Sequence, residues 1–298
     1  MVPLPLPPET LSHRRAVWLM VAVTLMWSIA GVVTRHLEHA RSFEVTFWRS
    51  LFTLLALLLI LPLAQGRAVF TTLRSGGRAL WVSGLCWSVM FTAFMVAIIL
   101  MPVANVLVTM AVGPLLTALF AWAFIGHRIA PRTWAAIALA GAGIAGMYGT
   151  QMAGLPLAGT LVALCVPLAA AVNWTVVQHA QQQGHAVNLM PAVLIGAVLS
   201  ALATLPLAWP LQATGRDLAL LALLGVVQLA IPCVLAVRCG RVLKAPEMAL
   251  LGLLEVIFGI LLAWAGAGER PAPAVLMGGA LVIGALVFNE LLAWKEEK

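Results

Sequence analysis

Charge is scarce in this sequence of 298 residues. Charged side chains make up 9% of the chain, which contains three Lys (Lys244, Lys295 and Lys298) and a single Asp, Asp217. Hydrophobic residues make up 63%, and the mean hydropathy is +1.05. A soluble domain of this composition has too few polar residues to cover its apolar ones. We therefore expect a membrane protein that meets water mainly at its loops and ends.

The motifs of several enzyme and pump classes are also missing. None of the three Lys follows a Gly, so the sequence has no phosphate-binding loop ending in Gly-Lys, and it has no His-Glu-x-x-His. No Ser is preceded two positions earlier by Gly, and one Asp cannot form an aspartyl pair. The four Cys lie in apolar runs without metal-binding spacing: Cys86, Cys165, Cys233 and Cys239. We therefore expect no catalysis, no cofactor and no metal.

Long apolar runs between polar, Pro and Gly residues divide the chain into ten segments. A helix needs about 20 apolar residues to cross a bilayer, and lipid requires it to satisfy its own backbone hydrogen bonds. The sequence therefore predicts an all-α membrane protein with ten transmembrane helices. The first run is long for a signal peptide and lacks a cleavage signal, so we interpret it as a span. The spans are expected at 16–37, 43–64, 79–100, 102–125, 132–148, 157–179, 190–209, 217–239, 246–266 and 273–294.

Basic residues indicate the orientation of these spans. With the N-terminus inside, the inside loops and ends contain twelve Lys and Arg and the outside loops contain four, while Arg49 lies within a span. The positive-inside rule then places both termini in the cytoplasm. The net charge of +7 therefore reflects membrane orientation rather than nucleic-acid binding.

An internal repeat relates the two halves of the chain. Residues 121–131, AWAFIGHRIAP, recur at 263–273 as AWAGAGERPAP, with seven of eleven positions identical. Residues 1–150 and 151–298 would then each form a five-helix repeat. Because five is odd, corresponding segments enter the membrane from opposite sides, so the repeats are inverted and enclose a central cavity. Secondary transporters commonly have this architecture, although a duplication kept only for packing is the alternative.

The sequence resembles the EamA-type, ten-span branch of the drug/metabolite transporter superfamily. The resemblance rests on Gly126-His127-Arg128 and Gly268-Glu269-Arg270, on Gly113-Pro114 matched by Glu255, and on Arg49. His127 replaces the family's usual acidic residue and Val256 its usual Pro. Within that branch the chain is similar to bacterial exporters of aromatic amino acids, in part through its Met-Trp-Ser motif at 26–28. The resemblance implies a bacterial inner-membrane exporter with a central cavity for amino acids and related metabolites.

Polar and aromatic residues deep within the predicted spans are candidates for that cavity. Each amide must hydrogen-bond within the bundle, either as contact between helices or as ligand contact, and each deep Trp either packs or lines a binding site. A cavity rich in aromatic rings and poor in charge would suit substrates with flat apolar side chains. The candidates are Trp27, Ser28, Trp87, Met90, Asn105, Asn173, Trp174, Gln178, Gln228 and Glu255.

Two ionisable residues within spans have open roles. Glu255 is expected near the bilayer midplane, where it contacts a substrate amine, carries a proton or forms a hydrogen bond between helices. Because the sequence places no His or second acid at that depth to relay a proton, we expect facilitated diffusion rather than proton coupling. Arg49 lies seven residues into its span, and a structural anchor that snorkels or pairs with Glu44 is favoured.

Three prolines inside spans are candidate hinges, and a set of small residues predicts close helix contacts. Pro114, Pro167 and Pro232 each remove a backbone hydrogen bond from a helix. Gly141, Ala145, Ala280 and Gly284, four apart on the fifth and tenth spans, suggest scaffold or homodimer surfaces.

These features predict a secondary transporter of amino acids, chiefly aromatic and other large neutral ones, working by alternating access. Its expected partners are the lipid bilayer and its small-molecule substrate. A carrier of nucleotide sugars would need more cavity Lys or Arg than Arg49 provides. A membrane scaffold without transport is the alternative from another class.

Overall fold

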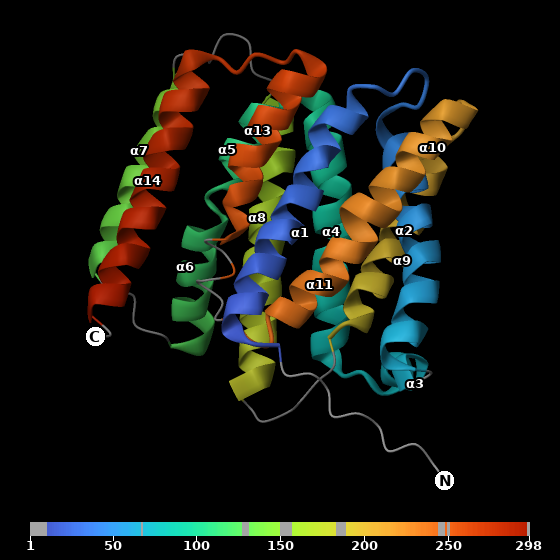
Figure 1. Cartoon of the computed structure of the whole chain (residues 1–298), viewed down its shortest axis with the longest axis horizontal. Coiled ribbons are helices and arrows are strands. Elements are labelled where there is room, and N and C mark those ends of the chain that lie inside the picture. The colour runs from blue at the N-terminus through green and yellow to red at the C-terminus, as the bar shows by residue number, and fades with distance from the viewer. Residues whose placement is uncertain are drawn as a thin grey trace.

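The computed structural model describes residues 11–66, 68–126, 131–149, 157–182, 189–243, 248 and 251–296. All regular secondary structure in these ranges is helical (Figure 1). Seven of the helical stretches described are long and apolar enough to cross a membrane, and three shorter ones are also apolar: Trp134–Gly143, Leu254–Ala267 and Pro273–Ala285. The prediction of an all-helical membrane protein is therefore confirmed, while the count of ten full spans stays a prediction.

Most helices begin and end within a few residues of the predicted spans, because the polar residues that bound the apolar runs also bound the helices. This group comprises α1 (His13–Thr34), α2 (Ser42–Gln65), α4 (Arg78–Leu100), α7 (Pro131–Gly149), α8 (Leu157–Gln182), α9 (Pro191–Ala208) and α14 (Pro273–Glu296). A short helix that no span predicts, α3 (Ala68–Ser75), connects α2 to α4.

Two predicted spans are broken near their middle. The fourth consists of α5 (Val103–Met110) and α6 (Gly113–Ile125), separated by a turn, and Pro114 stands in the first turn of α6. The eighth consists of α10 (Gly215–Leu223), the π-helical segment η1 (Leu224–Ala230) and α11 (Ile231–Cys239). Pro232 lacks an N–H and its ring crowds the carbonyl of Gln228, which is a physical reason for the wider turns before it.

The third candidate hinge lies in an unbroken helix, whereas the ninth span contains a turn. Pro167 lies inside the continuous helix α8, as predicted. In the ninth span a turn at Leu253 precedes α13 (Leu254–Ala267). Of the three candidate hinges, Pro114 and Pro232 therefore adjoin irregular backbone, and Pro167 does not.

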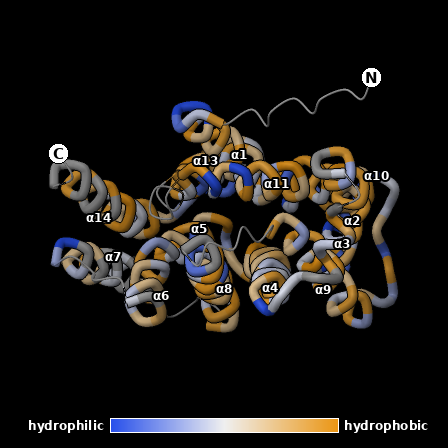
Figure 2. The backbone as a smooth tube through the Cα atoms, turned by 90° about the horizontal axis from the view of Figure 1, so that it is seen from below, coloured by the Kyte–Doolittle hydropathy of each residue, from blue (hydrophilic) through white to orange (hydrophobic). Residues whose placement is uncertain are grey.

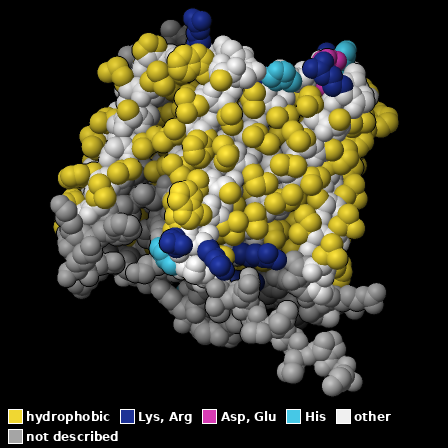
Figure 3. All heavy atoms as spheres, in the orientation of Figure 1, with side chains coloured by type: hydrophobic (Ala, Val, Ile, Leu, Met, Phe, Trp, Pro, Cys, Tyr) yellow, Lys and Arg dark blue, Asp and Glu magenta, His cyan; other side chains and the backbone are white. Residues whose placement is uncertain are grey.

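The helices run side by side and form two rows when seen along their axes (Figure 2). α1 packs against α13 and α11, α8 packs against α4 and α6, and α2 packs against α9. α7 and α14 pair with each other at one end of the molecule (Figures 1 and 2). On the face shown in Figure 3, apolar side chains cover the middle, and basic residues lie toward the upper and lower edges, where the helices end. This distribution fits a protein surrounded by lipid.

The close contact between α7 and α14 uses a different residue from those expected. A Cβ on Gly143 would lie 3.0 Å from the Gly278 carbonyl oxygen, whereas Cβ atoms on Gly141 and Gly284 would meet nothing within 4 Å. Ala280 is exposed, and the side chain of Ala145 lies outside those described. The expected homodimer surface stays a prediction.

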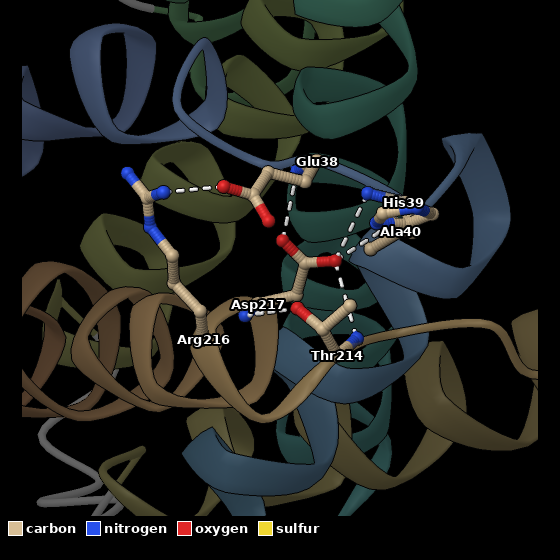
Figure 4. A network of polar contacts seen from close by, with 6 residues as sticks. All are labelled: Glu38, His39, Ala40, Thr214, Arg216 and Asp217. Atoms are coloured by element: carbon tan, nitrogen blue, oxygen red, sulfur yellow. Dashed lines mark hydrogen bonds and ion pairs between the residues drawn. The ribbon is translucent and has the colours of Figure 1, made fainter.

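One carboxylate fastens the loop between α1 and α2 to the start of α10 (Figure 4). Asp217 accepts hydrogen bonds from the backbone N–H groups of Glu38 (2.8 Å), His39 (3.0 Å) and Ala40 (3.1 Å). It also forms a capping box with Thr214 at the N-terminus of α10. The one Asp of the sequence is thus fully buried and holds a loop in place.

A second carboxylate makes the reciprocal connection. Glu44, in the first turn of α2, accepts hydrogen bonds from the N–H groups of Gln212 (2.7 Å) and Ala213 (2.8 Å) in the loop before α10. At the same end of the bundle Glu269 accepts from the Val103 N–H (2.8 Å) and pairs with Arg35 (3.3 Å). These bonds fix how α1, α2, α5, α10 and α13 stand relative to one another.

Candidate functional site

A cavity of about 190 Å³ lies between the two rows of helices. Its walls come from α1, α2, α4, α5, α6, α8, η1, α11 and α13. Most of the lining is aliphatic, methionine or aromatic, and the aromatic members are Trp27, Trp87, Phe91, Phe94 and Trp174. Small-molecule sites are typically apolar in this way, with a few polar groups that fix orientation.

Three of these aromatic side chains, Trp87, Phe91 and Trp174, form a connected wall. The rings of Trp87 and Trp174 meet edge to face, with centroids 6.4 Å apart and an interplanar angle of 80°. Trp87 also contacts Phe91, with centroids 5.6 Å apart. Because α4 packs against α8, this wall joins residues from both halves of the chain.

The helix breaks described above face the same space. Ala111, Gly113 and Pro114, at the α5–α6 break, line the cavity, as do Gly252 and Leu253 before α13. Irregular backbone at membrane depth is tolerated where it is buried in protein or lines a cavity. The breaks therefore mark the cavity as the place where the bundle departs from regular helix packing.

Arg49 contributes a positive charge to the cavity. It is 2% exposed, and its Nη1 donates a hydrogen bond to the Phe91 carbonyl oxygen (3.3 Å). The guanidinium carbon lies 6.0 Å from the ring centroid of Phe91 and 5.9 Å from that of Phe94, within cation–π range. Among the described residues, its Nε–H finds no hydrogen-bond partner. The guanidinium is thus held on its aromatic side and retains unused donor capacity.

Gln228 and Glu255 contribute acceptors. Gln228 lies in η1, where its Nε2 donates to the Trp27 carbonyl oxygen (3.3 Å). Its buried Oε1 accepts no hydrogen bond from the part of the chain that the structure describes. Glu255 stands in the first turn of α13 and interacts electrostatically with Arg49. Among the described residues, no carboxylate forms a direct ion pair with Arg49.

Close packing of η1 against α2 sets the positions of Gln228 and Arg49. Thr53 donates its hydroxyl to the Gly225 carbonyl oxygen (3.0 Å) and to the Arg49 carbonyl oxygen (2.8 Å). A Cβ on Gly225 would lie 2.6 Å from the Phe52 Cβ and 2.7 Å from the Arg49 carbonyl oxygen. A residue with a side chain therefore cannot occupy this position without moving η1 away from α2.

The structure brings six of the ten candidate site residues together in the cavity lining and leaves four elsewhere. Ser28 donates to the Thr24 (2.6 Å) and Glu255 (3.2 Å) carbonyl oxygens, and Asn173 accepts from Ser83 (2.6 Å), so both connect helices. Asn105 is buried in α5, and Gln178 is partly buried near the end of α8. The six on the cavity are Trp27, Trp87, Met90, Trp174, Gln228 and Glu255.

The expectation for Arg49 needs correction. It is buried rather than at the water interface, and it does not pair with Glu44, whose Oε1 accepts hydrogen bonds from the Gln212 and Ala213 N–H groups and from Trp48 Nε1 (3.3 Å). The lining also includes Thr117, Phe91 and Phe94, which were not candidates. Phe91 lies four residues after Trp87, on one face of α4, and this helical spacing was the available signal.

A multi-pass helical bundle that encloses a small, mostly apolar cavity has the architecture of a membrane transporter. The chain belongs to the EamA-like transporter family, whose model matches residues 14–149 and again residues 157–290. It is therefore a membrane transporter of small molecules.

No curated protein matches the sequence. A solved structure titled only as a crystal structure of a protein has a TM-score of 0.67 and 22% sequence identity, over 96% of this chain and all of that one. That likeness supports the fold alone.

Proposed function

We propose that this protein is a secondary transporter of amino acids, chiefly aromatic and other large neutral ones, and that it works by alternating access. The observation that carries the proposal is the aromatic lining of a cavity with few charged groups, in which Trp27 accompanies the wall of Trp87, Phe91 and Trp174. Flat apolar side chains gain stacking contacts on such a wall.

The size and charge of the cavity argue against larger phosphorylated substrates. Its volume of about 190 Å³ is below the ~300–1,000 Å³ of sites for drug-sized ligands. Arg49 is the one cationic side chain in the described lining, whereas a diphosphate carries more than one negative charge. A carrier of nucleotide sugars is therefore the weaker hypothesis.

Alternating access would follow from two inverted five-helix repeats. The helix contacts support this arrangement. When the two halves are exchanged, α4 corresponds to α11, α8 to α1 and α6 to α13. The contact of α4 with α8 then corresponds to that of α11 with α1, and the contact of α6 with α8 to that of α13 with α1. The two separate matches to the family model also support it. α1 begins and α14 ends at the same side of the bundle, which agrees with two cytoplasmic termini (Figure 1).

Counterflow in proteoliposomes tests the function. Vesicles containing the purified protein are preloaded with unlabelled L-phenylalanine, L-tryptophan, L-leucine, L-lysine or a nucleotide sugar, and entry of labelled L-phenylalanine is followed. The proposal predicts exchange with the first three and little with the last two. Counterflow with the nucleotide sugar alone, or with none of the panel, would contradict it.

A further inference from the structure

The described part of the cavity lining contains one basic and one acidic side chain, which do not pair with each other. One guanidinium, that of Arg49, and one carboxyl group, that of Glu255, face the same space without forming a direct ion pair, and the other described lining side chains carry no charge. A cavity for a simple cation or a simple anion would carry an excess of the opposite sign. A guanidinium and a separate carboxyl group instead complement a ligand that carries both a carboxylate and an ammonium group.

Arg49 is suited to bind an anion, because the described residues do not use all the hydrogen-bond donors of its guanidinium. It is 98% buried, so its charge has lost its hydration, and a buried charge needs charge-assisted hydrogen bonds to offset that cost. The structure provides one carbonyl acceptor and two aromatic faces, and leaves the Nε–H without a partner. A planar guanidinium in this condition is suited to a carboxylate, which it binds through two parallel N–H donors.

The opposite charge of the ligand also finds partners. Oε1 of Gln228 is a buried acceptor that receives no hydrogen bond from the described residues, and Glu255 supplies a carboxyl group. An ammonium group has three N–H donors and no acceptor, so it satisfies acceptors of this kind. Gln228 and Arg49 come from η1 and α2, which the Thr53 hydroxyl ties together (3.0 Å to the Gly225 carbonyl oxygen). Arg49 and Gln228, one from each proposed site, therefore stand on adjacent, mutually fixed segments.

From these observations we infer that Arg49 binds the α-carboxylate of the substrate, while Gln228 and Glu255 receive its α-ammonium group. The inference rests on the proposed function and adds to it a requirement for a zwitterion. Aromatic amines and aromatic acids that lack one of the two charges are then poor substrates. The side chain of the amino acid lies against Trp27, Trp87 and Trp174, so the polar groups select the class of compound and the aromatic wall selects its members.

The test compares ligands that differ in one charged group. L-Phenylalanine and L-phenylalaninamide share the ring and the ammonium group, but the amide lacks the carboxylate, whereas 3-phenylpropionate lacks the ammonium group. Each compound is measured as a competitor of labelled L-phenylalanine uptake into proteoliposomes. The expected result for the unmodified protein is inhibition by phenylalanine at a concentration about 10- to 100-fold lower than by either analogue, as charge-assisted hydrogen bonds provide.

Arg49→Gln is the informative variant, and Arg216→Gln is its matched control, because Arg216 is an exposed arginine outside the cavity. We expect Arg49→Gln to reduce the preference for phenylalanine over phenylalaninamide to less than about threefold, and Arg216→Gln to keep it. The preference is a ratio within one preparation, so it is independent of yield. If Arg49→Gln does not fold, Arg49→Lys replaces it; since lysine lacks the two-pronged geometry, its preference should be intermediate.

Three results would count against these assignments. Equal inhibition by phenylalanine and its amide in the unmodified protein would overturn the inference and leave the proposed function standing. If Arg49→Gln keeps the preference for phenylalanine over phenylalaninamide, Arg49 does not bind the carboxylate, while the proposed function still stands. Absence of phenylalanine transport by the unmodified protein would overturn the proposed function itself.

Discussion

Replacing Asp217 by Asn should destabilise the protein although it changes only one side-chain atom. The carboxylate accepts four backbone N–H groups, from Glu38, His39 and Ala40 and, at 3.2 Å, from Thr214 (Figure 4). Asn offers one acceptor oxygen and puts an NH₂ group against the N–H that the other oxygen received. One charge-assisted bond is lost, at about 1.5–3 kcal/mol, and a buried N–H loses its partner. We expect the free energy of unfolding to fall by about 2–4 kcal/mol.

The assay is unfolding of the purified protein in mixed micelles as the SDS fraction rises, followed by circular dichroism. Glu38→Gln is a demanding control, because Glu38 lies in the same loop and pairs with Arg216 through side chains that are 44% and 61% exposed. An exposed ion pair contributes about 0–1 kcal/mol. If Asp217→Asn costs no more than Glu38→Gln, the carboxylate does not hold the loop as described.

Four further substitutions test the site. Trp27→Ala or Trp174→Ala should lower saturable uptake of aromatic amino acids at unchanged protein yield, and unchanged uptake by both variants would remove them from the substrate site. Glu255→Gln should raise the half-saturating substrate concentration yet keep most downhill flux at saturation. Loss of that flux in a folded variant, or uphill accumulation by the unmodified protein under a pH gradient, would instead identify proton coupling through Glu255. Gly225→Ala should destabilise the fold by a few kcal/mol and weaken uptake, because its Cβ would meet α2, whereas Gly284→Ala, which meets open space, should do neither in the same SDS titration.

Hydropathy predicted where the helices lie because it depends on segments of about 20 residues. The bounds of α2 and α4 agree with the predicted spans to within a residue or two. The break between α5 and α6 was less accessible, since Pro114 could equally kink a continuous helix. The π-helical turns of η1 depend on hydrogen bonding around Pro232, which no apolar pattern records.

Arg49 shows why the site could be predicted only in part. Its distance from the end of the span was correct, but the direction of its side chain depends on which helices pack around α2. Glu44 was its expected partner, and that carboxylate is taken by the loop before α10, far away in the sequence. In contrast, Trp27 and Trp174 were accessible as candidates because they occupy corresponding places in the two halves, although the sequence left open whether each packs or lines the cavity; both are in the lining. His127, the partner of Glu269 in the repeat, lies outside the described residues.

The most direct test of the account is to locate a substrate in the cavity. A structure determined with 4-iodo-L-phenylalanine, after this compound has been shown to compete for uptake, reveals the iodine position by its anomalous scattering. The account predicts an iodine peak beside Trp87 and Trp174, with the carboxylate of the ligand at hydrogen-bonding distance from Arg49. A peak outside the cavity, or a carboxylate turned away from Arg49, would contradict it.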